Sequence, residues 1–349
     1  MLVCVCVCVL DGNADAWCAV LEDEGIGTYD TKALMDETGR FTAVFDPLDG
    51  SSNVDAGIPT GTIFGIFEDN AECIIPEEGC IDDDMSAPPP DDCDVSSEVS
   101  QACLTSTLQP GNSLVCSGYC LYSSSTFFCL TLGAGVQIFT LDTQIGEFVL
   151  THPNVQLAKR GKIYSFNEAN RKAWDPPLRA YIDDIQSGEG ESGKQYTSRY
   201  IGSMVGDVHR TLLYGGIFGY PADMKNKNGK LRLLYEAAPM AYLIEQAGGL
   251  ALTGKTRIMD LIPQSVHQRV PVILGSPDDV REVRKYYDIF TGSETMDDSD
   301  EAVAIRERCF ARLTPGQLLD TTMDKVVDSI AVDSTGDGKV DKIVKLPKA

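Results

Sequence analysis

The sequence predicts an α/β fold, a layered α+β sandwich made of two mixed-sheet halves with helices. The first observation is a pair of β-rich runs, residues 119–132 and 136–150, which meet at Gly133-Ala134-Gly135 and predict a hairpin. The second is the alternation of sheet and helix patterns after residue 150. The third is size, since 349 residues that are 43% hydrophobic can bury one large core or two modest ones. We expect a start at 1–18, an N-terminal half at 19–150, a C-terminal half at 151–290 and an extension at 291–349.

The chain begins with an alternation of Val and Cys, from Met1 to Leu10, that has no charge and no turn. Because it has no basic region, neither a signal peptide nor a transit peptide describes it. A GT dinucleotide repeat in DNA would encode such a pattern. We therefore interpret residues 1–18 as a low-complexity gene-model artefact in place of the true start; the alternative is a real edge strand.

The apolar run Phe41–Phe45 predicts a buried strand that leads into an acidic turn. The strand ends at Asp46, because Pro47 has no N–H to continue a central ladder. The spacing of Asp46 and Asp49 lets both carboxylates converge on one hard cation, with the Leu48 carbonyl as a further oxygen ligand.

Small residues follow the acidic turn. Gly50 permits close backbone approach, and Ser51 and Ser52, if they begin a helix, direct N–H groups towards an anion. The segment therefore predicts a metal-assisted phosphate site. The alternative is an acidic strand-to-helix turn with an Asx cap.

Residues 68–107 predict a mobile surface loop. They contain twelve Asp and Glu residues, no Lys or Arg, and the run Pro88-Pro89-Pro90. Such a segment has too little apolar surface to offset the entropy of ordering. It also holds four of the twelve cysteines, which allow three full pairings: Cys73, Cys80, Cys93 and Cys103.

In the second half, helical periodicity covers residues 178–185, 203–213 and 238–247, and Gly248-Gly249 stops the last of these helices. Residues 231–235 predict an apolar strand that ends at Glu236. An acid directly after a buried run is unusual, because burying a carboxylate costs free energy unless it has a partner. A late buried strand is expected at 270–275 and a final helix at 278–287.

Two further features bear on metal binding: the histidines, and a segment near the C-terminus that is similar to a calcium loop. The three histidines, at 152, 209 and 267, form no metal-binding doublet, so an oxygen-rich magnesium site is favoured over zinc, and His209 is expected to pack within a helix. Asp333–Asp341 is similar to the start of a calcium loop, but Val344 stands where a bidentate Glu is expected. We interpret it as a polar turn.

A net charge of −23 argues against a nucleic-acid partner, and no apolar run approaches the length of a membrane span. An anionic substrate would be repelled unless positive charge is concentrated locally. Two clusters could do this: Lys225, Lys227, Lys230 and Arg232 in one, and Arg199 with Arg210 in the other.

The string Phe45–Asn53 resembles the metal motif of fructose-1,6-bisphosphatases, within the magnesium-dependent, lithium-sensitive sugar and inositol phosphatases. Further similar motifs follow in the same order, from about Phe41 to about Tyr287. They are Gly61–Phe67, Gln109–Asn112, Gly118–Tyr122, Tyr164–Glu168, Arg199–Gly216 and Gly229–Glu236. The resemblance implies a sugar-phosphatase fold that here lacks the usual N-terminal helices, so control by AMP is not expected.

The resemblance also implies a cofactor and its ligands. Two or three Mg²⁺ ions, which Mn²⁺ could replace, would be held by Asp46, Asp49, the Leu48 carbonyl and Glu236. Glu22 and Asp23 would join these catalytic acids, because Glu22-Asp23-Glu24 is similar to an acidic tripeptide of the family. The alternative for that tripeptide is a solvated acidic turn.

The implied substrate is a sugar bisphosphate. Its 1-phosphate would be cradled by Gly50, Ser51 and Ser52, and Arg232 would approach the sugar or this phosphate. The second phosphate needs a separate cationic pocket with hydroxyl donors. The matching positions are Asn167, Arg199, Tyr200, Tyr220 and Lys230. In the family the counterpart of Arg199 comes from a neighbouring subunit, which implies a homotetramer.

The acidic insertion at 68–107 lies where chloroplast members of the family carry a thioredoxin-controlled loop. By this resemblance Cys73 and Cys103 are the preferred regulatory disulfide, with Cys80 and Cys93 as rivals, and Leu108 replaces a third family cysteine. The resemblance implies a thioredoxin partner and the plastid stroma; the cytoplasm is the alternative.

The resemblance thus implies a redox-regulated hydrolase of plastid carbon fixation that converts fructose 1,6-bisphosphate to fructose 6-phosphate and phosphate. One alternative is activity on sedoheptulose 1,7-bisphosphate. Another is a non-catalytic protein that binds sugar phosphate or thioredoxin, because the atypical start could impair the metal site.

Overall fold

The structure is a computed structural model. It describes residues 41–68, 107–291, 299–313, 315–319, 329–335, 337 and 339–346, and the backbone alone of residues 5–10 and 18–20. Glu22, Asp23 and the insertion cysteines Cys73, Cys80, Cys93 and Cys103 lie outside the described residues. No helix in the described ranges has the length and apolar character needed to cross a bilayer.

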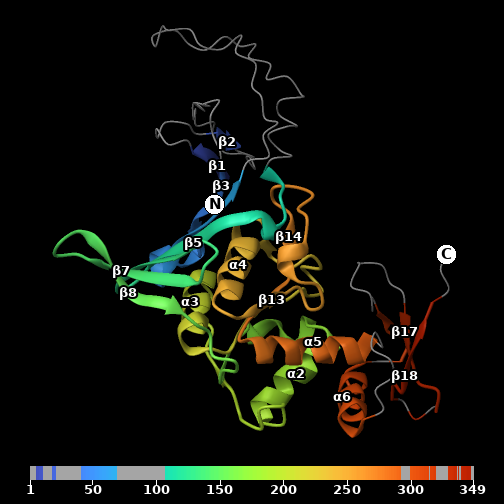
Figure 1. The fold of residues 1–349 in the computed structure, drawn as a ribbon. Coiled ribbons are helices and arrows are strands. Elements are labelled where there is room, and N and C mark those ends of the chain that lie inside the picture. Colours follow the sequence, from blue (N-terminus) through green and yellow to red (C-terminus); the bar gives the residue numbers. More distant parts are fainter. Residues whose placement is uncertain are drawn as a thin grey trace, which may run out of the picture.

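The first half of the described chain is one large sheet of strands in the order β2-β1-β3-β4-β5-β6-β7-β8 (Figure 1). Its strands are β1 (Val5–Leu10), β2 (Cys18–Val20), β3 (Phe41–Asp49), β4 (Thr60–Glu68), β5 (Leu114–Tyr122), β6 (Thr126–Thr131), β7 (Val136–Asp142) and β8 (Glu147–Val155). The α/β class is confirmed, but this sheet is antiparallel at every described pairing, not mixed. Short connections join neighbouring strands from β5 to β8, whereas a parallel pair requires a long crossover.

The start of the chain takes part in this sheet, since β1 pairs with β2 on one side and with β3 on the other. Residues 5–10 therefore form an inner strand and not the edge strand that was considered, and the interpretation of residues 1–18 as an artefact stays a prediction. The predicted hairpin corresponds to β6 and β7, which turn at residues 132–135.

The second sheet is mixed, with the order β10-β9-β11-β15-β13. Its strands are β9 (Ile163–Ser165), β10 (Thr197–Ser198), β11 (Ile217–Tyr220), β13 (Leu250–Leu252) and β15 (Val272–Gly275). Strand β9 is parallel to β10 and β11, and β15 is antiparallel to β11 and β13. A separate ribbon joins β12 (Leu231–Arg232) to β14 (Arg269–Val270).

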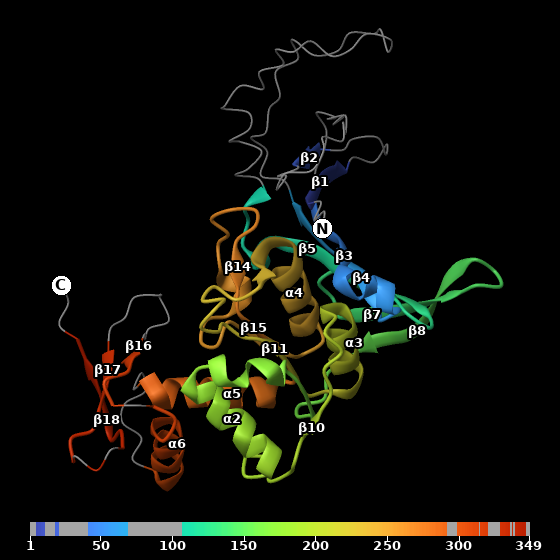
Figure 2. The ribbon, with the colours of Figure 1, turned by 180° about the vertical axis from the view of Figure 1, so that it is seen from behind.

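Helices separate and cover the sheets in alternating layers (Figures 1 and 2). Helices α3 (Met204–Tyr214) and α4 (Ala238–Gln246) lie between the large and the mixed sheet, where their apolar side chains form one core with those of both sheets. Helices α2 (Pro176–Ser187) and α5 (Pro277–Thr291) cover the other face of the mixed sheet and form a second core. The sequence predicted all four helices, the first three from periodicity. The helix expected at 278–287 is not the final one, because another helix follows it at Asp300–Phe310.

Short helical turns complete the fold: η1 (Ser51–Ala56), η2 (Gly111–Ser113), η3 (Glu168–Ala173), η4 (Leu233–Ala237) and η5 (Ile258–Asp260). The strand predicted at 231–235 is wrong beyond Arg232, because Leu233–Ala237 form a π-helical turn that leads into α4. A run this short, apolar except for Arg232, fits a buried strand and a buried helical turn equally well.

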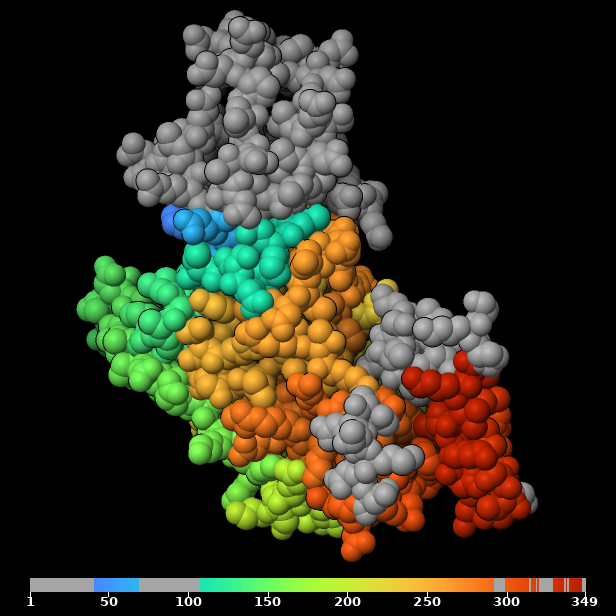
Figure 3. All heavy atoms as spheres, turned by 45° about the vertical axis from the view of Figure 1, so that its right-hand side comes forward, coloured from blue at the N-terminus to red at the C-terminus, as the bar shows by residue number. Residues whose placement is uncertain are grey.

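The C-terminal extension packs on the second core as a small unit at one side of the molecule (Figure 3). It consists of α6 (Asp300–Phe310) and a sheet of β16 (Leu318–Leu319), β17 (Ser329–Val332) and β18 (Lys342–Lys345). Ala302, Ile305, Cys309 and Ala331 are buried in this core. The segment similar to a calcium loop connects β17 to β18.

Candidate metal and phosphate site

The acidic turn is an irregularity in the central pairing of β3 with β4. Asp46 pairs with Ile63 and Asp49 with Gly61, so Pro47 and Leu48 together stand opposite one residue. Such a bulge locally increases the twist and redirects side chains. The turn is closed by Asp46, whose Oδ1 accepts a hydrogen bond from the Leu48 N–H at 3.0 Å.

Gly50 then reverses the chain into the 3₁₀ turn η1. Its φ of 76° is in the left-handed region, and an added Cβ would lie 3.1 Å from the Ser203 hydroxyl oxygen. Only glycine meets both conditions without strain. Ser51 and Ser52 therefore open a helical turn directly beside the two acids, as predicted.

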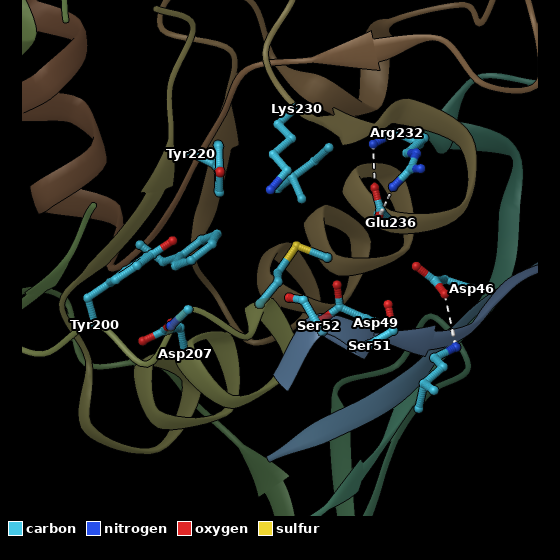
Figure 4. A pocket seen from close by; sticks show the side chains of 16 residues that line it. Asp46, Asp49, Ser51, Ser52, Tyr200, Asp207, Tyr220, Lys230, Arg232 and Glu236 are labelled. Atoms are coloured by element: carbon cyan, nitrogen blue, oxygen red, sulfur yellow. Dashed lines mark hydrogen bonds and ion pairs between the residues drawn. The ribbon is translucent and has the colours of Figure 1, made fainter. Parts of the chain in front are cut away.

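Glu236 completes a cluster of three buried carboxylates. Asp46, Asp49 and Glu236 each offer an oxygen within 4.8 Å of the others, and they are 5%, 8% and 2% exposed. Figure 4 shows the three side chains at one end of the pocket, below Arg232. Two elements far apart in sequence, β3 and η4, thus bring together the acids that the sequence selected.

The electrostatics of this cluster favour a bound cation. Burial, together with the neighbouring Asp46, raises the pKa of Asp49 to about 6, although N–H groups at the start of α3 oppose the shift. Burial also raises the pKa of Glu236 to about 8, against the hydrogen bond from the Arg232 N–H. The Arg232 guanidinium lies 3.4 Å from a Glu236 carboxylate oxygen, and its positive charge offsets part of the rise in the pKa of Glu236. Buried carboxylates that repel one another in this way fit a hard divalent cation.

The other end of the pocket is cationic and aromatic. The Lys230 ammonium lies 5.4 Å from the centre of the Tyr220 ring, in a cation–π arrangement. Tyr200 faces Tyr220 across this end (Figure 4), and its pKa is raised to about 12, mainly by burial. At neutral pH Tyr200 is therefore a hydroxyl donor, which suits an anion.

Most of the predicted residues line this one pocket. Its complete lining is Asp46, Leu48, Asp49, Gly50, Ser51, Ser52, Tyr200, Gly202, Met204, Asp207, Phe218, Tyr220, Lys230, Leu231, Arg232 and Glu236. Asn167 and Arg199 are not in this lining. Asn167 caps η3 by accepting a hydrogen bond from the Ala169 N–H, and Arg199 is exposed with its guanidinium bonded to the Ser198 carbonyl.

Asp207 is a lining residue that the sequence reasoning did not select. Its fully buried carboxylate accepts hydrogen bonds from the Ile201 and Gly202 N–H groups and pairs with Arg210. It thereby fixes the segment that carries Tyr200. The available signal was an acid in the first turn of a helix, three residues before an arginine on the same face.

His209 packs in α3, as predicted. It is buried, its Nδ1 lies 2.7 Å from the Tyr119 hydroxyl, and its ring contacts Phe127. Among the described residues, the metal-ligand cluster contains no histidine.

A layered α/β fold that places a trio of buried carboxylates at one end of a pocket, and Lys and Tyr at the other, is typical of proteins that bind phosphorylated ligands with a divalent cation. Two family models match the chain: the N-terminal domain of fructose-1-6-bisphosphatase over residues 18–153, and its C-terminal domain over residues 157–288. The chain belongs to the fructose-1,6-bisphosphatase family, whose dependence on divalent metal agrees with the acidic cluster.

Individual relatives agree with this assignment. The chain is 54% identical over 249 residues to fructose-1,6-bisphosphatase 1, chloroplastic, of Arabidopsis thaliana, and 55% identical over 249 residues to the chloroplastic enzyme of Spinacia oleracea. These matches cover 71% of this chain and 57% of each relative. The crystal structure of Leishmania major fructose-1,6-bisphosphatase in holo form matches with a TM-score of 0.59 and 44% identity, over 70% of this chain and 68% of that one.

Proposed function

We propose that this protein is a phosphoric monoester hydrolase that converts fructose 1,6-bisphosphate to fructose 6-phosphate and phosphate. The observation that carries the proposal is the single pocket with Asp46, Asp49 and Glu236 at one end and Lys230 with two tyrosines at the other. A ligand with two phosphates at opposite ends of a sugar has the matching charge distribution. Family membership and the names of the relatives support the substrate.

The proposed cofactor is Mg²⁺, two or three ions in each subunit, with Mn²⁺ as a substitute. Asp46, Asp49, Glu236 and the Leu48 carbonyl would hold it, with Glu22 and Asp23 as further candidates from the undescribed region. When bound, such ions neutralise phosphoryl oxygens, lower the pKa of water and stabilise the leaving oxygen. Oxygen-only ligands favour Mg²⁺ over zinc.

The protein's own groups bind and orient the substrate. Gly50, Ser51 and Ser52 would receive the 1-phosphate beside the acids, and Arg232 would contact the sugar or this phosphate. Lys230, Tyr200 and Tyr220 would hold the second phosphate as hydrogen-bond and charge donors. Asn167 and Arg199 remain predicted ligands of that phosphate, and an exposed Arg199 is compatible with action on a neighbouring subunit.

Phosphate release from fructose 1,6-bisphosphate, measured with and without Mg²⁺, tests the proposal. We expect activity that requires Mg²⁺ and is lost in Asp46→Asn. Sedoheptulose 1,7-bisphosphate as the preferred substrate would favour the first alternative. Absence of release from either sugar, with retained sugar-phosphate binding, would favour the non-catalytic alternative and contradict the proposal.

We further propose thioredoxin-type regulation through Cys73 and Cys103 in the plastid stroma, supported by the chloroplastic names of the relatives. Closing a loop of this length would stabilise the oxidised form by about 2 to 4 kcal/mol. Titration of activity against dithiothreitol, in wild type and in Cys73→Ser, tests this regulation. Equal rates for oxidised and reduced protein would contradict it.

The proposed homotetramer is tested by sedimentation equilibrium.

A further inference from the structure

The bulge in β3 has a single residue opposite it, and that residue is Thr62. Because Asp46 pairs with Ile63 and Asp49 with Gly61, Thr62 on β4 faces both Pro47 and Leu48. One residue cannot form the regular backbone hydrogen bonds of a β-ladder with two residues of the opposite strand. The described side chains make up for this, since the Asp46 carboxylate accepts from the Leu48 N–H and the Thr62 hydroxyl donates to the Pro47 carbonyl at 2.8 Å.

A second hydroxyl supports the first. The Tyr122 hydroxyl on β5 lies 2.8 Å from the Thr62 hydroxyl oxygen. A carbonyl can only accept, so the single hydroxyl hydrogen of Thr62 is directed at Pro47, and Tyr122 must therefore be the donor to Thr62. The result is a directed chain from Tyr122 through Thr62 to the backbone of the acidic turn, in which each hydrogen bond polarises the next.

We propose that Thr62 and Tyr122 are positioning residues, whose hydroxyl chain fixes the bulge that brings Asp46 and Asp49 to a shared divalent cation. The inference rests on the metal site of the proposed function. Neither side chain is offered as a cation ligand, and Thr62 and Tyr122 are not in the lining of the pocket. They act through the Pro47 carbonyl, which is flanked by Asp46 and by the proposed ligand Leu48.

The two hydroxyls can be removed with little other change. Valine has nearly the shape of threonine, so Thr62→Val removes one donor and leaves the volume of the half-buried side chain. Tyr122 is 41% exposed at the end of β5, so Tyr122→Phe removes a hydroxyl without opening the core. Thr140 provides a matched control, because its hydroxyl lies 2.8 Å from that of Thr151 in the same sheet, on β7 and β8.

Direct Mn²⁺ binding, followed by the loss of the free-ion electron paramagnetic resonance signal, gives a readout that does not depend on turnover. We expect Thr62→Val to weaken Mn²⁺ binding about three- to tenfold, as for the loss of one part-buried hydrogen bond, and Tyr122→Phe to weaken it about twofold. Thr62→Ser keeps the donor and should restore binding, and Thr140→Val should match wild type. The Michaelis constant for the sugar should change less than the Mg²⁺ concentration for half-maximal rate.

The outcomes separate this inference from the proposed function. Wild-type binding in Thr62→Val and Tyr122→Phe, with loss of binding in Asp46→Asn, would overturn the positioning role and leave the metal site intact. Equal weakening in Thr140→Val would also overturn it, because the effect would then belong to the sheet in general. If the protein releases no phosphate, the proposed hydrolase activity is wrong. Weakened Mn²⁺ binding in Thr62→Val and Tyr122→Phe would then still support the positioning role.

Discussion

Glu236 shows how one buried acid can be costly to the fold and useful to the site. It is 2% exposed, and its pKa is raised because burial disfavours the charged form and Asp49 and Asp46 lie close by. The hydrogen bond from the Arg232 N–H offsets only part of this effect. Residues kept at such cost commonly serve a function.

Replacing Glu236 by Gln should therefore separate stability from activity. At neutral pH we expect the melting temperature of the metal-free protein to rise. Burial raises the pKa of Glu236 to about 8, so folding must protonate a carboxylate that is ionised in the unfolded chain, and Gln does not carry this cost. The proposed Mg²⁺-dependent phosphate release should fall about a hundredfold or more. We expect Mg²⁺ to stabilise wild type, and this stabilisation should be absent from the variant. Differential scanning fluorimetry with and without Mg²⁺ and a phosphate assay measure these effects.

Glu147→Gln is the control for that experiment. It removes one negative charge from an exposed position on β8 and should leave both readouts unchanged. An undiminished response of Glu236→Gln to Mg²⁺ would contradict the assignment of Glu236 as a ligand.

His209 should make stability depend on pH. Burial lowers its pKa from 6.5 to about 4 in the folded protein, with a smaller contribution from His152. Below pH 6.5 the unfolded chain therefore binds a proton that the folded chain does not, so stability falls as the pH drops from 6.5 towards 4. From about pH 7 to about pH 5, wild type should lose about 2 kcal/mol more unfolding free energy than His209→Gln.

Urea denaturation at each pH measures this difference. His152→Gln removes an exposed histidine and should retain most of the wild-type loss. Parallel pH profiles for wild type and His209→Gln would show that His209 titrates normally and is not buried in solution.

At the scale of elements, the acidic turn depends on the glycine that separates β3 from η1. Gly50 and Gly57 stand at the two ends of η1, with φ of 76° and 64°. An added Cβ at Gly50 would crowd the Ser203 hydroxyl at 3.1 Å, whereas at Gly57 nothing lies within 4 Å. A side chain at either position would therefore strain the backbone, but only a side chain at Gly50 would also crowd a neighbouring residue.

Alanine at each position separates these effects. Both Gly50→Ala and Gly57→Ala should lose about 1 kcal/mol of unfolding free energy from a left-handed non-glycine residue. Only Gly50→Ala should also lose phosphate release, by about tenfold, because the turn that carries Asp49 and Ser51 must shift. Chemical denaturation and the phosphate assay test the pair, and equal activities would contradict a positional role for Gly50.

The predictability of the elements follows their length and pattern. Helices α3 and α5 show a clear apolar stripe, so local signals were sufficient for them. The end of β3 was predicted at Asp46, but the strand passes Pro47 through a bulge and ends at Asp49, which pairs with Gly61. The π-helical turn η4 was missed because the run Leu231–Tyr235, apolar except for Arg232, is too short to show a period that distinguishes a strand from a helix. Asp207 was missed because its role depends on backbone N–H groups of the preceding loop, which fold back onto the first turn of α3.

At the scale of the whole molecule, the C-terminal extension belongs to the folded body. The family model ends at residue 288, yet α6 beyond it packs on α2 and α5 and contributes Ile305 and Cys309 to their core. Ion pairs cross the same boundary. Arg308 lies 2.8 Å from Asp184, which also accepts a hydrogen bond from Tyr286, and Arg312 pairs with Asp183.

The Arg308–Asp184 pair offers a test of this docking, because its two members differ in exposure. The Asp184 side chain is 2% exposed and that of Arg308 is 33% exposed. Arg308→Met would leave a buried carboxylate with the Tyr286 hydroxyl as its remaining side-chain partner and should lower the unfolding free energy by about 2 kcal/mol, less than for a fully buried pair. Adding Asp184→Asn should recover part of the loss, since the stranded charge is then removed.

Arg281→Met is the matched control, because the Arg281–Asp278 pair has the same 2.8 Å separation but 63% and 38% exposed side chains. Arg281→Met should lower the unfolding free energy by less than about 0.5 kcal/mol. Urea unfolding of the full chain distinguishes the two variants. If Arg308→Met is no more destabilising than Arg281→Met, α6 does not dock on α2 in solution. If the expected difference is found, the extension stabilises the helical layer of α2 and α5, which covers the face of the mixed sheet opposite α3 and α4.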